Sequence, residues 1–391
     1  MTGIVTLAIC YVLSHFYRAF LAVLSPVLSS ELGMSPDEMS TALGAWFVTF
    51  AACQLLIGVL LDRIGPKLTC AIMFALGGAG GGLLFAAATS GTMVLIAMIL
   101  LGAGCSPILM GSLYIFKLNY DARKFATLMS VFIAVGLLGN VLGSSPLAFA
   151  MDSIGWRGTL VGLSALTLVL CVLILLTVKD PDKVPVPEGG GGYLDILKLR
   201  ELWWILPLVF FNYALSGGLR GIWAGPYLDI IHQMDATGIG FVTFWMAIAM
   251  AVSSFLYGPA DRIFNSRKWV VVPGSLISLA AIAWWALNPS ISASGATVVL
   301  ITIGMFSMSY GVLMAHATAN IPNHMAGRGV TLVNLFNMGG VGLMQWVTGA
   351  VYKGSDVAIP LVAFQNVFWV YVVGFGGAVV IYLFSRDVKP G

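Results

Sequence analysis

The sequence predicts an all-α membrane protein with twelve transmembrane helices in two pseudo-symmetric six-helix halves. Three observations lead to this fold class. The 391 residues are 59% hydrophobic and only 9% charged, whereas a soluble domain carries roughly 25% charged residues. Apolar segments long enough to cross a bilayer follow one another along the chain. The basic residues gather in alternate connections between these segments, as they do in polytopic membrane proteins.

A helix needs about 20 predominantly apolar residues to cross the hydrocarbon core, and each predicted span is at least that long. Ser35 precedes Pro36 and Glu38, the order expected of a helix start with a capping box. Asp235 stands in the matching place before the eighth span. The spans cover residues 4–30, 36–61, 68–88, 92–116, 125–150, 157–178, 202–230, 236–260, 269–288, 295–319, 327–351 and 361–384.

The start of the chain resembles no cleaved signal peptide, because it lacks a basic region and its first apolar segment is long enough to span. That segment begins almost at Met1, which is consistent with the loss of a native polar tail. The five cysteines all fall inside apolar segments at unrelated spacings. We expect them to act as small apolar residues, without disulfides or metal ligation.

The longest polar stretch runs from Lys179 to Glu201 and is rich in proline and glycine, which predicts a linker. It divides the chain into an N-terminal half (1–180), a cytoplasmic linker (181–200) and a C-terminal half (201–391).

The two halves repeat short patterns at nearly constant spacing. Arg18 corresponds to Arg220, a shift of 202 residues, and Asp62 corresponds to Asp261, a shift of 199. Parallel repeats of this kind predict a two-fold axis along the membrane normal, with a ligand site between the repeats near the bilayer midplane.

The basic residues predict that both termini face the cytoplasm of a bacterial-type inner membrane. With that orientation, only Arg157 and Lys353 lie in outer connections, and Arg18 and Arg220 lie within spans. The other basic residues fall in inner connections or the C-terminal tail: Arg63, Lys67, Lys117, Arg123, Lys124, Lys179, Lys183, Lys198, Arg200, Arg262, Arg267, Lys268, Arg328, Arg386 and Lys389.

The two membrane arginines belong to a motif that occurs once in each half. Residues 11–18 and 213–220 both read Tyr-x-Leu-Ser-x-x-x-Arg. On an α-helix the tyrosine, serine and arginine of this motif share one face. Arginine keeps its charge, and its placement mid-bilayer costs at least ~2.5 kcal/mol. All 16 acidic residues lie outside the middle of the spans, so Arg18 and Arg220 are predicted to hold an external anion.

The same helix faces carry candidate neighbours for that anion. The alternative is that the arginines snorkel to a membrane edge or bond to backbone carbonyls, and that the aromatic residues pack helices. Gly217, Gly218 and Gly221 are expected to let the helix around Arg220 bend or admit a ligand. The predicted substrate-binding residues are Arg18, Arg220, Tyr11, Ser14, Tyr213, Ser216, Trp223 and Tyr227.

His15 and His316 are the candidates for proton coupling, because they are the other titratable residues placed within spans. The alternative is that each is a hydrogen-bonded packing residue.

Glu31 and Asp229 close the outer ends of spans one and seven. They would pair across an outer gate, carry protons or simply face solvent.

The connection after the second span resembles a known family. Gly58–Lys67 reads GVLLDRIGPK, which is similar to the signature loop of the major facilitator superfamily, and GPADRIFNSRK is a degraded copy in the second half. Residues 155–157 read Gly-Trp-Arg before span six and also resemble that family. We expect the two loops that contain Asp62 and Asp261 to form a conformational latch with charge pairs and helix-end contacts. The gating candidates are Asp62, Arg63, Lys67, Asp261 and Arg262.

A membrane arginine in the first span of each half is similar to the organic-anion branch of this superfamily, which includes sugar-phosphate exchangers. Span four carries no arginine between Thr92 and Phe116, which separates the chain from many proton-driven drug exporters. Nitrate carriers share the glycine-rich fifth and eleventh spans seen around Asn140 and Asn337. Their paired arginines, however, lie in spans two and eight.

The sequence therefore predicts a secondary transporter of a small organic or inorganic anion, not an enzyme. Alternating access would move the anion while it bridges Arg18 and Arg220, by exchange or by proton symport. The alternatives are an exporter of amphipathic compounds driven by proton antiport, a nitrate-type carrier, or a membrane enzyme or receptor on a transporter scaffold. We expect a monomer whose partners are the anion, protons in the symport case, and the bilayer, with no cofactor and no nucleic acid.

Overall fold

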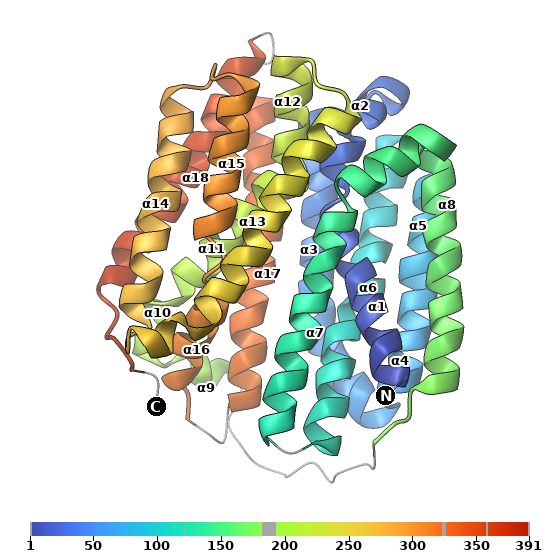
Figure 1. Cartoon of the computed structure of the whole chain (residues 1–391), viewed down its shortest axis with the longest axis vertical. Coiled ribbons are helices and arrows are strands. Elements are labelled where there is room, and N and C mark those ends of the chain that lie inside the picture. The colour runs from blue at the N-terminus through green and yellow to red at the C-terminus, as the bar shows by residue number, and fades with distance from the viewer. Residues whose placement is uncertain (1, 121, 182–192, 323–325, 357–358, 390–391) are drawn as a thin grey trace. The chain divides into compact units, whose positions relative to one another are not determined.

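The computed structural model describes residues 2–120, 122–181, 193–322, 326–356 and 359–389 (Figure 1). Within these ranges it describes every side chain except those of Asp62, Lys117, 122–127, 130 and 326–328. Several predictions therefore fall outside the described part: most of the linker, with Lys183, and the side chains of Asp62, Lys117, Arg123, Lys124 and Arg328. Every regular element in the described ranges is a helix.

Internal contacts divide the chain into two compact units. The first unit is Met1–Pro185 with Met234–Phe244, and the second is Val186–Gln233 with Trp245–Gly391. The predicted boundary at 181–200 stays a prediction, because residues 182–192 lie outside the described part.

Long apolar helices make up the first unit, and α3 packs against α6 while α1 packs against α7. One of its segments, η1, is a π-helix. The elements are α1 (Thr2–Phe16), α2 (Leu21–Leu32), α3 (Pro36–Arg63), α4 (Pro66–Met73), η1 (Phe74–Ala79), α5 (Gly80–Ala86), α6 (Gly91–Asn119), α7 (Ala122–Leu142) and α8 (Ser145–Thr177).

The second unit also contains one π-helix, η2, and its α14, α15 and α18 lie side by side (Figure 1). Its elements are α9 (Tyr193–Leu197), α10 (Arg200–Trp203), α11 (Leu206–Gly218), η2 (Leu219–Trp223), α12 (Ala224–His232), most of α13 (Ala236–Ile263), α14 (Lys268–Leu287), α15 (Ala293–Phe306), α16 (Tyr310–Ala319), α17 (Ala326–Gly354) and α18 (Pro360–Leu383). The start of α13, through Phe244, belongs to the first unit.

In the described part of the chain, nine helical stretches are long and apolar enough to cross a membrane, or ten if the bent pair α1 and α2 is one span. The fifth predicted span contributes only the shorter apolar helix Val131–Leu142. The eleventh predicted span is helical as α17. The exact number of twelve spans stays a prediction.

The predicted helix starts are confirmed at two connections. The backbone N–H of Ser35 donates to the Glu38 carboxylate at 3.0 Å, and together they form the capping box of α3. The Asp235 carboxylate accepts from the backbone N–H of Gly238 at 2.8 Å. Both satisfy donors that a helix N-terminus leaves without an intrahelical partner.

The prediction of a continuous fifth span through residue 150 was wrong. Helix α7 ends at Leu142, and α8 begins at Ser145. Pro146, in the first turn of α8, has no N–H to continue the ladder from the preceding helix. The Ser144 hydroxyl donates instead to the carbonyl of Asn140 at 2.9 Å.

Glycines allow the helices that carry the arginine motifs to approach their neighbours. A side chain at Gly139 in α7 would overlap the carbonyl of Val12 in α1, and one at Gly136 would overlap the Tyr11 ring. A side chain at Gly340 in α17 would overlap the carbonyl of Phe210 in α11. Close packing is therefore the role of these glycines in both units.

Candidate functional site

Arg18 lies at an interruption of the first span. Helix α1 ends at Phe16, α2 begins at Leu21, and the two helices are bent by 49°. The backbone N–H of Ala19 donates to the carbonyl of Phe16 at 3.0 Å, a tighter turn than that of an α-helix. The prediction of one regular helix over residues 4–30 was wrong at this point.

Aromatic side chains surround the break. Tyr17 meets Phe20 edge to face with 5.7 Å between ring centroids, and Phe20 meets Phe85 of α5 at 5.4 Å. Neither glycine nor proline occurs in residues 17–20, and the Phe20 ring of this segment packs against α5.

The Arg18 side chain is buried and faces α3. Its Nη2 lies 3.3 Å from the Ser14 hydroxyl, and its Nε lies 3.4 Å from the Ser14 carbonyl. Its guanidinium carbon lies 5.3 Å from the centroid of Trp46 and 5.5 Å from that of Phe50. These contacts favour the cation. No carboxylate forms an ion pair with Arg18 among the described residues.

Arg220 lies in the π-helix η2, directly after α11 ends at Gly218. A π-turn holds more residues than an α-turn and often occurs at functional sites. The predicted common face of Tyr213, Ser216 and Arg220 stays a prediction. A side chain at Gly218 would lie 2.6 Å from the amide nitrogen of Gln345 and would overlap the Tyr371 hydroxyl. The helix changes from α to π at these glycines, and the expected bend stays a prediction.

The tyrosine of each motif packs inside its own unit. Tyr11 stacks on Phe132 of α7 with 5.0 Å between centroids and meets His15 edge to face at 4.7 Å. Tyr213 covers Gly217, where an added side chain would lie 3.1 Å from the ring. In the first motif, the Ser14 hydroxyl lies 3.3 Å from Nη2 of Arg18.

Trp223 and Tyr227 bond to the interior of the second unit. The Trp223 indole N–H donates to the Thr348 hydroxyl at 3.0 Å. The Tyr227 hydroxyl donates to the carbonyl of Pro289 at 2.7 Å, and its ring meets Trp285 edge to face at 4.9 Å. These contacts match the packing alternative for the two residues. Ser216 lies 4.0 Å from the Met308 sulfur.

Both ring nitrogens of His316 have close partners. Nδ1 lies 2.8 Å from the Tyr382 hydroxyl, and Nε2 lies 2.8 Å from the carbonyl of Arg386. The imidazole thus joins α16 to the end of α18 and the segment after it, as expected for a packing histidine.

A carboxylate that the sequence analysis did not single out caps a helix beside each predicted latch loop. In the first unit, Asp180 accepts from the N–H of Lys67 at 2.8 Å. In the second, Asp387 accepts from the N–H groups of Arg267 and Lys268 at 3.1 and 3.0 Å, and from the Ser266 hydroxyl at 2.7 Å. Each carboxylate follows the last helix of its unit and lies at the start of α4 or α14.

The gating candidates themselves make different contacts. Asp261 pairs with Arg267 at 3.7 Å, whereas Arg262 is exposed. Arg63 ends α3 and is also exposed. The side chain of Asp62 lies outside the described residues.

The Gly-Trp-Arg segment holds the end of α2 within the first unit. The Trp156 indole donates to Glu31 at 3.1 Å, and the Arg157 guanidinium pairs with the same carboxylate. Arg157 also donates to the carbonyl of Ala88 at 3.2 Å. Glu31 therefore has partners inside its own unit.

Comparison with known proteins identifies the family. The model of the Major Facilitator Superfamily matches residues 7–345. The chain belongs to the Major Facilitator Superfamily. It is a multi-pass membrane transporter and not an enzyme, and the resemblance seen in the signature loop is confirmed.

Two relatives are named as transporters of organic anions. The chain is 22% identical over 346 residues to a probable L-galactonate transporter of Escherichia coli (strain K12), covering 79% of this chain and 73% of that protein. It is 23% identical over 379 residues to a putative tartrate transporter of Agrobacterium vitis, covering 88% of this chain and 83% of that protein.

The fold of this superfamily member is also found in solved structures. A bacterial homolog of the human lysosomal transporter Spinster, crystallised in an inward-facing and unoccupied conformation, matches with a TM-score of 0.80. The two are 17% identical, and the match covers 98% of this chain and 96% of the other.

Proposed function

We propose that this chain transports a small hydroxylated carboxylate by alternating access, with the carboxylate bound to both Arg18 and Arg220. One observation supports this proposal above the others. In each unit the first long membrane segment carries an arginine where its α-helix is interrupted, by the break at 17–20 or by η2. Arg18 is 4% exposed and Arg220 is 2% exposed. Interrupted helices present polar groups to ligands in many carriers.

The electrostatics of a buried guanidinium favour an anionic ligand. Removing this cation from water costs several kcal/mol unless hydrogen bonds or an opposite charge compensate. Ser14, Trp46 and Phe50 supply part of that compensation to Arg18. A carboxylate would supply the rest through charge-assisted N–H···O bonds to the two guanidinium groups.

The class of anion follows from the relatives and the polar neighbours. L-Galactonate and tartrate, named in the two relatives, are carboxylates that carry several hydroxyls. We assign the hydroxyls to polar groups along the two arginine segments: Ser14, which contacts Arg18 in the first unit, and Gln345 and Tyr371, which lie beside Gly218 in the second. Tyr11, Tyr213 and Ser216 remain proposed lining residues, and Trp223 and Tyr227 would support η2 from behind.

The coupling mode follows from the charge of the empty site. Without substrate, two permanent positive charges would cross the low-dielectric region uncompensated. The anion-bound form should therefore reorient much faster, which favours exchange over uniport. Proton symport would need a group such as His316 or the substrate itself to carry the proton. The loops at Asp62 and Asp261 would latch and release as the protein reorients, with both termini in the cytoplasm.

Counterflow in proteoliposomes tests the function. Labelled tartrate or L-galactonate should enter vesicles preloaded with the same unlabelled anion much faster than empty vesicles, with little response to a pH gradient. Neutral sugars in excess should not compete, whereas hydroxylated carboxylates should. If empty vesicles accumulated substrate when the outside was made acidic, and His316→Gln removed that accumulation, proton symport would replace exchange. Uptake of uncharged amphipathic compounds alone would refute the anion assignment.

A further inference from the structure

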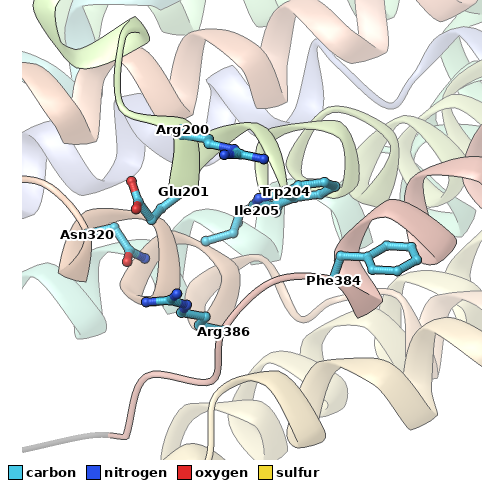
Figure 2. Close-up of a pocket in the computed structure, with 7 residues that line it drawn as sticks. All are labelled: Arg200, Glu201, Trp204, Ile205, Asn320, Phe384 and Arg386. Carbon is cyan, nitrogen blue, oxygen red and sulfur yellow. The ribbon is translucent and has the colours of Figure 1, made fainter.

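A cavity of about 290 Å³ lies in the second unit, and Figure 2 shows the residues that line it. It is lined by Arg200 and Glu201 of α10, Trp204, Asn320 after α16, and Phe384 and Arg386 after α18. Arg220 lies fourteen residues beyond Leu206, the first residue of α11, which corresponds to about 20 Å of helix. The cavity is thus separate from the proposed substrate site.

The backbone that carries Arg386 is held in place. Its own carbonyl bonds to His316, and the Lys268 ammonium donates to the carbonyl of Ser385 at 2.8 Å. The next residue, Asp387, bonds to the start of α14. The guanidinium of Arg386 therefore extends from a fixed segment, so a ligand that bonds to it orders little additional chain.

Charge and donor groups in the cavity favour a phosphate. Two arginines and one glutamate give a net charge of +1. Figure 2 shows Arg200 and Glu201 extending to opposite sides of α10, and Arg386 extending toward Asn320. Neither arginine forms an ion pair with a carboxylate of the described residues. Guanidinium groups bind phosphate oxygens through paired hydrogen bonds.

Exposed aromatic residues place this end of the second unit at the membrane interface. Phe384 is 67% exposed, Trp203 of α10 is 50% exposed and Trp269 of α14 is 59% exposed. Each lies at or next to a helix end, and the Lys268 ammonium lies 5.3 Å from the Trp269 ring. Tryptophan rings at the ends of membrane helices lie at the level of the lipid headgroups, so the cavity is within reach of those headgroups.

We propose that this cavity binds the phosphate of an acidic phospholipid headgroup, with Arg200 and Arg386 as its anchors. The Asn320 amide lies beside the phosphate, and Trp204 and Phe384 contact the glycerol and the upper acyl chains. Their rings lie 5.8 Å apart and form the apolar side of the cavity. Basic pockets between membrane helices are suited to such headgroups. The shared chemistry also fits free inorganic phosphate, and the test separates the two sources.

Native mass spectrometry of the detergent-purified full chain tests the proposal. The probes are dioctanoyl phosphatidylglycerol, dioctanoyl phosphatidylcholine and inorganic phosphate. Phosphatidylglycerol should bind at least tenfold more tightly than phosphatidylcholine, and millimolar phosphate should not displace it. If inorganic phosphate bound equally well and displaced the lipid, the site would be one for free phosphate and the lipid assignment would be wrong.

Charge-changing substitutions test whether the charges in the cavity contribute to phosphatidylglycerol binding. Arg200→Gln and Arg386→Gln should each weaken phosphatidylglycerol binding about tenfold, and Glu201→Gln should strengthen it. Lys198→Gln is the matched control, because Lys198 is exposed near Arg200 but pairs with Asp195 at 2.9 Å and does not line the cavity. Equal losses in the Lys198 and arginine variants would indicate general surface charge and overturn the proposal.

Folding and function are checked separately. Arg200 and Arg386 are exposed, so their Gln variants should unfold at the parent temperature in lipid-free detergent. Should either fail to fold, the Lys substitution keeps the charge and should retain part of the lipid affinity. Arg220→Gln should bind phosphatidylglycerol like the parent even if transport is lost. Loss of lipid binding in Arg220→Gln would contradict the separation of the two sites.

Discussion

Replacing Asp387 with asparagine should loosen the junction between the C-terminal segment and the start of α14. The carboxylate accepts three hydrogen bonds, from Arg267, Lys268 and Ser266. Hydrogen bonds to a charged group contribute ~1.5–3 kcal/mol each when buried, but this side chain is exposed and asparagine keeps one oxygen acceptor. We therefore estimate a loss of about 1–2 kcal/mol, which is a ~5–30-fold change in the local opening equilibrium.

Hydrogen exchange of the Arg267 and Lys268 amides measures this opening directly. Both amides should exchange about 5–30 times faster in Asp387→Asn at pH 7. Asp152→Asn, at an exposed residue of α8, is the control and should leave these amides unchanged. Unchanged protection in Asp387→Asn would refute the cap.

The same cap predicts the direction of a pH effect. Burial raises the pKa of Asp387. Hydrogen bonds from the Lys268 N–H, the Ser266 hydroxyl and the Arg267 N–H together lower this pKa by more than burial raises it, so the pKa lies below its ordinary value. Such a carboxyl stabilises the folded state above the unfolded pKa of about 3.9 and loses this contribution as the pH falls through the folded pKa. After correction for intrinsic rates, protection should decline below about pH 4 in the parent but not in Asp387→Asn.

Four further substitutions test other contacts. Gly139→Ala places a methyl group against the Val12 carbonyl and should destabilise the chain by about 1–3 kcal/mol in thermal unfolding. The methyl group of Gly162→Ala would meet no neighbouring atom, so this control should be neutral. Trp46→Leu removes a cation–π contact to Arg18 and should weaken anion binding by about 0.5–2 kcal/mol in calorimetry; an unchanged affinity would remove Trp46 from the site. Asp62→Asn should change the balance of cysteine labelling on the two faces without loss of substrate affinity; the reverse result would move Asp62 from the latch to the site.

The sequence was sufficient for features that depend on local chemistry. The capping box at Ser35 and Glu38 follows from spacing alone, and the two arginine motifs follow from internal repetition. The family follows from the signature loop at Gly58–Lys67. These features need only the identity of nearby residues, so they could be read without the fold.

Features that depend on tertiary contacts could not be predicted in this way. The break at 17–20 has no glycine or proline to mark it, and its aromatic rings pack against each other and against α5. The contact of Arg18 with Trp46 and Phe50 requires α3 to lie beside the break. The caps formed by Asp180 and Asp387 join segments more than 100 residues apart. The sequence does contain a signal for these two caps, because an acidic residue recurs just after the last span of each half.

Substrate binding to single arginine variants tests whether Arg18 and Arg220 both hold the anion. Calorimetric titration of L-galactonate and tartrate into the parent, Arg18→Gln and Arg220→Gln would compare both anchors, with exposed Lys353→Gln as the charge control. We predict that each arginine variant folds but loses binding. Lys at either position should rescue poorly because it lacks the planar fork. Lys353→Gln should bind like the parent. Near-parental affinity in either Arg18→Gln or Arg220→Gln would contradict the proposal that both residues hold the anion.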